Sequence, residues 1–357
     1  LANWAVQFSA NQMSSAVVDE AIRCIIDTIG VSLAGTAHPH ALMSRKLARE
    51  TYGPGPCHII SEAPTCSAPG AAFCNGVAAH VLDFDDVSYE GMVHASAVVW
   101  PAVMAAGELV DATGEEVLVA FVCAVEAEYA MGRALTHDLF WRGWWTTGLL
   151  GSIGAAIGAA KVMGLDATQT REAINIAACQ ATGPYVLVGS PVKPYACGRA
   201  AEAGVQAALA ARCGLEGPTQ CFEHVNGFIA MYGNNRFVPE ELAQLGSRFV
   251  LDTSQVTFKR YPVCSAGQSS IEALQAILVS NGLDGEDVAR VCSEVTSDVA
   301  HYMAVEHATN ITEAQFCLPF CLACVLRFGE LTPRHLAPEI IEDAGIINAM
   351  AKTDIIY

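Results

Sequence analysis

The residues of this chain best suited to chemistry lie between two apolar, helix-like runs, in the segment NGVAAHVLDFDDVSYEGMVHASAVVWPA. Asp83 and His94 flank a Ser-Tyr-Glu-Gly turn, so we expect the two ends of this loop to face one another. A carboxylate that fixes the tautomer of a histidine produces an acid or base that works near neutral pH. The sequence therefore makes Asp83 and His94 candidates for general acid–base catalysis, with a purely structural role as the alternative.

Asp85, Asp86 and His80 belong to the same segment but fit a structural role better. Aspartate is a preferred helix cap, and a helix-like run begins shortly after this pair. His80 falls inside an apolar helical run, where a histidine can simply pack. Charged residues are rarely buried without a partner, so the cluster as a whole either caps helices or does chemistry.

Two basic segments offer positive charge to an acidic substrate. Lys193 precedes Pro194, which favours an extended backbone at this lysine, and the segment leads into a predicted helix that begins at Arg199. A lysine at a helix entrance adds its charge to the partial positive charge of the helix N-terminus, a combination that binds carboxylates. Lys259 and Arg260 end a predicted strand. The alternatives are a solvated lysine and an ordinary basic turn.

Composition excludes several classes of function. The formal net charge is −18, which makes nucleic acid and anionic membrane surfaces poor partners. The 14 cysteines are scattered through apolar runs, which favours a reducing, cytoplasmic compartment. Cys317, Cys321 and Cys324 include a CxxC, but they share one predicted helix and are interpreted as core residues. Nucleotide-binding glycine motifs and the GxSxG of serine hydrolases are absent from the sequence.

Hydrophobic periodicity predicts a mainly α protein. We expect an all-helical domain over residues 1–250 and a smaller α+β domain over 251–357, where RFVLDTSQVTFK and ARVCSEVTSDVA indicate strands. The chain then stops without an obvious finishing element. The predicted helices are Ser14–Leu33, Ser67–Val81, Ala95–Val110, Glu115–Ala134, Thr147–Val162, Thr168–Ala181, Arg199–Arg212, Thr312–Phe328 and Pro338–Ala351.

The motifs, taken in order, resemble the MmgE/PrpD family. They are GAAFCNGVAAHVLDFDD with a histidine after it, KP before a Gly-Arg-Ala-Ala helix, FKRYPVC, and TEAQFCLPFCLACVL. The resemblance extends from about Asp27 to Gly329. It implies a large helical domain, a smaller α+β domain, a homodimer, and no metal or organic cofactor. Family members are usually longer at the C-terminus, so the resemblance also implies that a final segment is missing here.

Carried over residue by residue, the resemblance assigns catalytic roles to five positions. These are Asp83, His94, Lys193, Lys259 and Tyr302, the last placed eleven residues before the glutamate of TEAQF. The chain also departs from the family pattern. Val87 stands where many members have threonine, and Trp145, Ala196 and Cys264 stand where relatives have histidines. The acid–base set of a dehydratase or decarboxylase is thus incomplete, and the substrate stays open.

The resemblance implies an enzyme that removes a proton next to a carboxylate of a small di- or tricarboxylic acid. Lys193, Lys259 and Arg260 are expected to bind carboxylates, His94 or Lys193 to act as the base, and Tyr302 as the opposing acid. The favoured reaction is that of a 2-methylcitrate dehydratase-like lyase. The alternatives are an iminodisuccinate epimerase-like isomerase, a decarboxylase, and a catalytically silent scaffold or small-acid-binding protein.

Overall fold

The computed structural model describes residues 1–63, 65–135, 138–234 and 236–357, which form two compact units. The first unit comprises residues 1–81, 85–188 and 192–258, and the second comprises 82–84, 189–191 and 259–357. The protein is mainly α, as the sequence predicts, with a smaller second unit. Two short segments, Leu82–Phe84 and Gly189–Pro191, belong to the second unit, although the residues on both sides of each belong to the first. Periodicity did not indicate this division.

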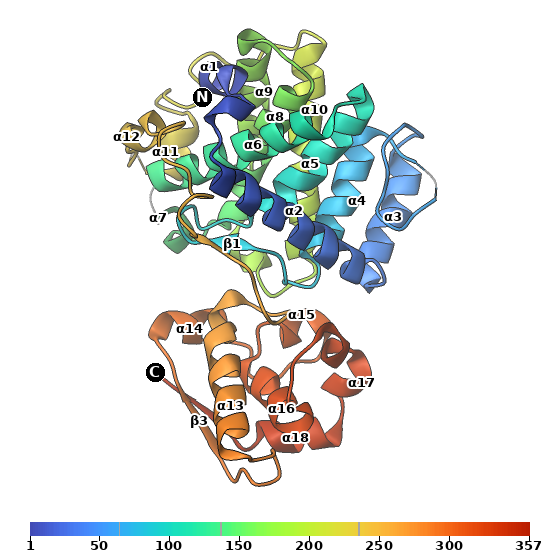
Figure 1. Ribbon diagram of the computed structural model, residues 1–357, viewed down its shortest axis with the longest axis vertical. Helices are drawn as coiled ribbons and strands as arrows, with labels where there is room; N and C mark the ends of the chain where they lie inside the picture. Colours follow the sequence, from blue (N-terminus) through green and yellow to red (C-terminus); the bar gives the residue numbers. More distant parts are fainter. Residues whose placement is uncertain (64, 136–137, 235) are drawn as a thin grey trace. The chain divides into compact units, whose positions relative to one another are not determined.

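Long helices form the body of the first unit (Figure 1). Helix α10 packs against α4, α8 and α9, while α5 packs against α4, α6 and α8. The helices of this unit are α1 (Ala2–Gln7), α2 (Ser15–Gly35), α3 (Pro39–Thr51), α4 (Ala68–His80), α5 (Ala95–Val110), α6 (Gly114–Ala134), α7 (Asp138–Trp141), α8 (Thr146–Val162), α9 (Ala167–Gln180), α10 (Val192–Arg212), α11 (Phe228–Tyr232) and α12 (Pro239–Ala243).

Local sequence explains where these helices begin. The Ser14 hydroxyl accepts a hydrogen bond from the backbone N–H of Val17 at the start of α2. Thr113 and Glu116 form a capping box at the start of α6. Such contacts satisfy backbone donors that have no partner inside the helix. The predicted helices of this unit are confirmed within a few residues, except that α10 begins at Val192 instead of Arg199.

The first unit also contains a two-stranded antiparallel sheet that the sequence only half indicated. Strand β1 (Val87–Ser88) pairs with β2 (Val256–Thr257), with Val87 opposite Thr257. Strand β2 lies in the predicted strand segment, but β1 was expected to be part of a loop. The pairing fixes the backbone directly after Asp86, which lies in the acid cluster.

The second unit is built around two helices and a short parallel sheet. Helix α13 (Gln268–Asn281) packs against α16 (Leu318–Phe328), and strand β3 (Val291–Glu294) pairs in parallel with β4 (Thr353–Ile356). Cys317, Cys321 and Cys324 are buried in the core of this unit, as predicted. The shorter helices are α14 (Ser297–Tyr302), α15 (Ile311–Ala314), α17 (Pro338–Ile341) and α18 (Ala344–Met350).

Small residues let the central helices approach closely. A methyl group added at Gly204 on α10 would lie 2.3 Å from the Cβ atom of Ala155 on α8 and 2.6 Å from its carbonyl carbon. The backbone atom cannot move aside as the tip of a flexible side chain can. The glycine- and alanine-rich runs of the sequence are therefore explained by helix packing.

We expect Gly204→Ala to lower the free energy of unfolding by about 1–3 kcal/mol, because overpacking forces the two helices apart. The matched control is Gly30→Ala on α2, where an added methyl group meets no atom within 4 Å. That change should raise stability by up to about 1 kcal/mol, since alanine favours a helix over glycine. Denaturant unfolding measures both, and equal effects would contradict the packing argument.

Candidate active site

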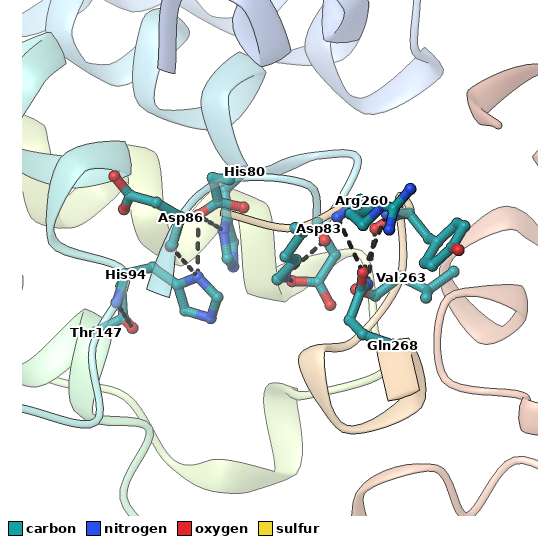
Figure 2. Close-up of polar contacts among 11 residues, drawn as sticks. His80, Asp83, Asp86, His94, Thr147, Arg260, Val263 and Gln268 are labelled. Atoms are coloured by element: carbon teal, nitrogen blue, oxygen red, sulfur yellow. Dashed lines mark hydrogen bonds and ion pairs between the residues drawn. The ribbon is translucent and has the colours of Figure 1, made fainter. Parts of the chain in front are cut away.

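A buried carboxylate between two histidines forms the centre of the candidate site. His80 is the last residue of α4, His94 directly precedes α5, and Asp85 lies in the loop between them. The Oδ2 atom of Asp85 is 2.8 Å from Nδ1 of His80 and 3.1 Å from Nδ1 of His94. The two imidazole rings meet edge to face, with centroids 4.8 Å apart. Figure 2 shows both histidines beside the loop that carries Asp86.

These contacts show which nitrogen of the His94 ring carries the proton. The Nδ1 atom of His94 also lies 2.9 Å from the backbone carbonyl oxygen of Asp86, so both of its neighbours are acceptors. A neutral imidazole has one donor and one acceptor nitrogen. The Nδ1 atom must therefore be the donor, which leaves Nε2 of His94 as the proton acceptor. The side chain of His94 is 13% exposed, whereas those of His80 and Asp85 are fully buried.

Electrostatics support one negative charge at this centre. Burial lowers the pKa of His80 to about 4, so this ring is neutral at physiological pH. Burial by itself would raise the pKa of Asp85, but the adjacent imidazoles hold it well below its usual value. An ionised Asp85 therefore accepts hydrogen bonds from Nδ1 of both rings. This arrangement stabilises positive charge on His94 once that ring takes up a proton.

Two further residues fix the position of His94. Its backbone N–H donates to Oγ1 of Thr147, at the start of α8, over 3.0 Å (Figure 2). The Ser96 hydroxyl donates to Oδ2 of Asp86 over 2.5 Å, which ties the carbonyl partner of His94 to the first turn of α5. Thr147 gave no signal in the sequence, because a threonine at the start of a helix is common.

Lys193 is buried in the first turn of α10, and its ammonium group lies 5.7 Å from the centre of the Trp145 ring. The expected extended backbone at this lysine is wrong. Proline is tolerated in the first helical turn, where its missing N–H removes no helical bond, so the helix continues through Pro194. Trp145 also packs on His80, with ring centroids 5.5 Å apart. An ammonium group near this tryptophan helps to keep the imidazole of His80 neutral.

The expected pairing of Asp83 with His94 stays a prediction, and Asp83 and Asp85 each have a close ionic contact. The carboxylate that lies 3.1 Å from Nδ1 of His94 is that of Asp85. In the second unit, Lys259 donates to the backbone oxygen of Asp83 over 2.6 Å and to its Oδ1 atom over 2.9 Å, and both side chains are buried. Asp83 has a left-handed backbone with φ of 47°, which is uncommon for a residue other than glycine. The ion pair holds this strained turn.

The other two predicted site residues also lie in the second unit. The guanidinium group of Arg260 forms a 2.5 Å ion pair with Glu272, and both side chains are exposed. Its backbone N–H donates to Gln268 (Figure 2). Tyr302 is the last residue of α14 and is half-buried beside the ring of His301. Their expected roles stay predictions.

The three central residues are also a possible ligand set for a cation. Ligand atoms of His80, Asp85 and His94 lie within 4.8 Å of one another. Imidazole nitrogens and a carboxylate suit a divalent transition metal. A metal on the Nδ1 atoms would have to displace both protons that now bind Asp85. The expectation of a metal-free site therefore stays a prediction.

Comparison with known proteins identifies the class. Residues 1–240 match the model of the MmgE/PrpD N-terminal domain, and residues 261–357 match that of the MmgE/PrpD C-terminal domain. The chain belongs to the MmgE/PrpD family, as its motifs predicted.

Curated relatives are named for one activity. The chain is 31% identical to human cis-aconitate decarboxylase over 262 residues, which is 70% of this chain and 53% of that protein. It is 30% identical to the mouse cis-aconitate decarboxylase over 283 residues. A cis-aconitate decarboxylase-like protein of Aspergillus oryzae is 26% identical across 100% of this chain and 79% of its own length. The chain thus spans about half the length of the two mammalian enzymes. Among the described residues, no helix is long and apolar enough to cross a membrane.

Two further buried carboxyl groups, those of Asp86 and Glu128, differ from Asp85 in the direction of their pKa shifts. Burial raises the pKa of Asp86 to about 7 and that of Glu128, on α6, to about 8. Both oxygens of Glu128 are buried without a hydrogen-bond partner among the described residues. Glu128 is therefore protonated in the folded protein at neutral pH, and the negative charge of Asp86 raises its pKa further.

Glu128 should make the protein less stable as the pH rises. Its usual pKa of 4.5 applies in the unfolded chain, so between pH 4.5 and about 8 the folded state binds more protons than the unfolded state. We expect Glu128→Gln to flatten the fall in stability over this window by up to about 1.4 kcal/mol per pH unit. Urea unfolding at several pH values measures this slope. Glu115→Gln, an exposed change on the same helix, should leave the slope unchanged.

Proposed function

We propose that this chain is part of a lyase that acts on a small di- or tricarboxylic acid by transferring a proton at the carbon next to a carboxylate. The observation that carries the proposal is the environment of His94. Its Nδ1–H contacts Asp85 and the backbone of Asp86, and its Nε2 atom is left as a proton acceptor. A histidine held in one tautomer by a buried carboxylate is an efficient general base or acid.

The proposed reaction step needs a base and a nearby positive charge. When Nε2 of His94 removes the proton, negative charge develops on the substrate carbon and its carboxylate. Asp85 stabilises the imidazolium that forms. Lys193 is a buried cation of the same unit, and we propose that it stabilises the developing negative charge. In a decarboxylation the proton moves in the opposite direction. Protonated His94 then donates a proton to the carbanion left by loss of CO₂.

The names of the relatives favour one substrate for the first test. Cis-aconitate is the acid on which the human and mouse relatives are named to act. Its decarboxylation breaks a carbon–carbon bond and releases CO₂. The electron pair left on the carbon framework must then take up one proton, which is the step proposed for His94. Dehydration of 2-methylcitrate, which the family resemblance favoured, and epimerisation of iminodisuccinate use the same proton transfer and stay predictions.

Lys259 and Asp83 are proposed to act as positioning residues. Their buried ion pair holds the turn at Leu82–Phe84, which separates α4 from Asp85 along the chain. The charge of Lys259 is thus balanced by Asp83 within its own unit. Substrate binding by Lys259 and Arg260, and proton donation by Tyr302, have no support from these contacts and stay expectations of the family resemblance.

The reaction type can be read directly by NMR. The protein is incubated in deuterated water with cis-aconitate, 2-methylcitrate, citrate and iminodisuccinate in separate samples. Loss of CO₂ indicates a decarboxylase, formation of an alkene with loss of water a dehydratase, and deuterium at the α-carbon without an alkene an epimerase. Absence of both turnover and exchange would contradict the proposed function and favour a silent scaffold. A parallel sample with a chelator tests whether His80, Asp85 and His94 hold a required metal.

His94→Ala is expected to lower kcat by about 100-fold or more, because general acid–base catalysis contributes at least that much. Steady-state kinetics on the accepted substrate measure the change. The matched control is His58→Ala, which removes an exposed histidine of the same unit that pairs with Glu108. Unchanged activity in His94→Ala would reject the assignment of the base.

Asp85→Asn should also lower kcat by roughly 100-fold or more, since the amide can present its N–H to His94 and favour the wrong tautomer. The pH dependence of kcat distinguishes this effect from simple loss of structure. The pH dependence of kcat should be unchanged in the control Asp138→Asn, which alters a partly exposed aspartate of the same unit that pairs with Arg236. A variant that keeps the wild-type rate would show that Asp85 does not orient the base.

Lys193→Ala is expected to lower kcat by about 100-fold and to raise KM, because one cation acts on both the bound carboxylate and the developing charge. Lys46→Ala, which removes an exposed lysine on α3, is the control. A change confined to KM would limit Lys193 to substrate binding.

A further inference from the structure

Two cysteines of the first unit lie in contact at its surface. The Sγ atoms of Cys179 and Cys221 are 3.9 Å apart, although the residues are separated by 42 positions in the sequence. Cys179 lies in the last turn of α9, and Cys221 lies in the segment 213–227 that joins α10 to α11. Cys179 is exposed and Cys221 is half-buried. The proposed reaction uses neither residue.

This pair differs from the cysteines of the core. Buried thiols such as those of Cys57 and Cys197 point at backbone carbonyl oxygens of Ala105 and Ala97, which is how a small apolar residue with a weak donor packs. A cavity of about 440 Å³ lies directly beside the contacting pair and includes both sulfur-bearing residues in its lining. A small oxidant can therefore reach the sulfurs.

The backbone on both sides of the pair is held in place. The N–H of Phe228 donates to the carbonyl oxygen of Cys221 over 2.9 Å, and the Cys221 thiol lies 3.6 Å from the carbonyl oxygen of Asn175 on α9. Gln220, the residue before Cys221, has a left-handed backbone with φ of 61°. The segment is thus folded against the end of α9. A disulfide needs its sulfurs about 2 Å apart, so a shift of roughly 2 Å closes the bond.

We propose that Cys179 and Cys221 form a reversible redox site in which hydrogen peroxide oxidises the pair to an intramolecular disulfide. Cys179, as the exposed thiol, reacts first: its sulfur attacks the peroxide oxygen, gives a sulfenic acid and releases water. The Cys221 thiol then attacks that sulfur, a sulfur–sulfur bond forms, and a second water leaves. The two thiols lose two electrons and two protons, and the peroxide is reduced to water. Thiols such as glutathione reverse the reaction.

The division of roles follows from exposure and solvation. Burial first, and the neighbouring Cys179 second, raise the pKa of Cys221 to about 12. A thiol with such a pKa is a poor attacker of peroxide, since the thiolate is the nucleophile. Cys221 is thus the poorer attacker of peroxide, which leaves the exposed Cys179 as the thiol that reacts first.

The redox site is connected to the candidate active site through short contacts within the first unit. The Tyr232 hydroxyl donates to the carbonyl oxygen of Ala181, just after α9, and its ring packs edge to face on Trp144 at 4.8 Å. The backbone N–H of Trp145 donates to the carbonyl oxygen of Gly183. The cross-link would therefore restrain the segment that holds Trp145 in place, beside His80.

The test is oxidation of the full chain with hydrogen peroxide at a low molar excess, followed by digestion without reduction and mass spectrometry. We expect one linked peptide pair that contains Cys179 and Cys221, lighter by two hydrogen atoms, which disappears after treatment with dithiothreitol. The melting temperature of the oxidised protein should rise by roughly 5 °C, because the cross-link restricts the unfolded chain. Oxidation that links other cysteines, or that links two molecules, would overturn the proposal.

Serine variants separate the two roles and control for folding. Cys179→Ser and Cys221→Ser should each abolish the linked peptide, while Cys213→Ser, which removes another exposed cysteine of this unit, should preserve it. In Cys221→Ser, the reagent dimedone should label Cys179 as a sulfenic acid. If dimedone labels Cys221 in Cys179→Ser but does not label Cys179 in Cys221→Ser, the assigned order is overturned. The melting temperature of each reduced variant shows whether it is folded, and labelling of the wild-type protein with dimedone at early times tests the order without any substitution.

Discussion

The candidate site depends on one buried negative charge. Asp85 has no exposed side-chain surface, and ionising a carboxyl group in such a place is costly unless donors surround it. The imidazoles of His80 and His94 supply those donors, one from the end of α4 and one from the start of α5. The same hydrogen bonds decide which nitrogen of His94 faces outward. The hydrogen bonds that stabilise the buried charge of Asp85 are therefore the same ones that orient His94, the proposed base.

The surrounding carboxyl groups show why a single charge is tolerated. Asp86 and Glu128 are equally buried, but their pKa values rise to about 7 and about 8. The Ser96 hydroxyl donates to Asp86, whereas the side-chain oxygens of Glu128 have no hydrogen-bond partner among the described residues. Like charges at short range disfavour a second ionisation, so the proton stays on the groups with the fewest donors. Among these three buried groups, Asp85 is held ionised by its donors, Glu128 keeps its proton at neutral pH, and Asp86 has a pKa of about 7.

Sequence patterns predicted the helices well but could not rank the acids. Periodicity located α2, α4, α5, α6, α8 and α9 to within a few residues, because apolar spacing follows the helix repeat. Residue types and the family motifs identified His94 and Lys193 as candidates. They favoured Asp83 over Asp85, since the direction of each side chain in a short loop depends on backbone angles that the sequence does not reveal. Asp83 has a left-handed backbone in this loop, and the acid that contacts both histidines is Asp85, two residues later.

The small sheet of the first unit has a consequence for the order of folding. Strand β1 lies in the loop between His80 and His94, and its partner β2 is at residues 256–257, far along the chain. Pairs so distant in sequence form slowly, because a long loop must close before any contact is gained. During synthesis, α4 and α5 can pack long before β2 leaves the ribosome. The loop between His80 and His94 therefore gains its strand pairing only after residues 256–257 have been made, so a shorter nascent chain lacks the contact that fixes the backbone after Asp86.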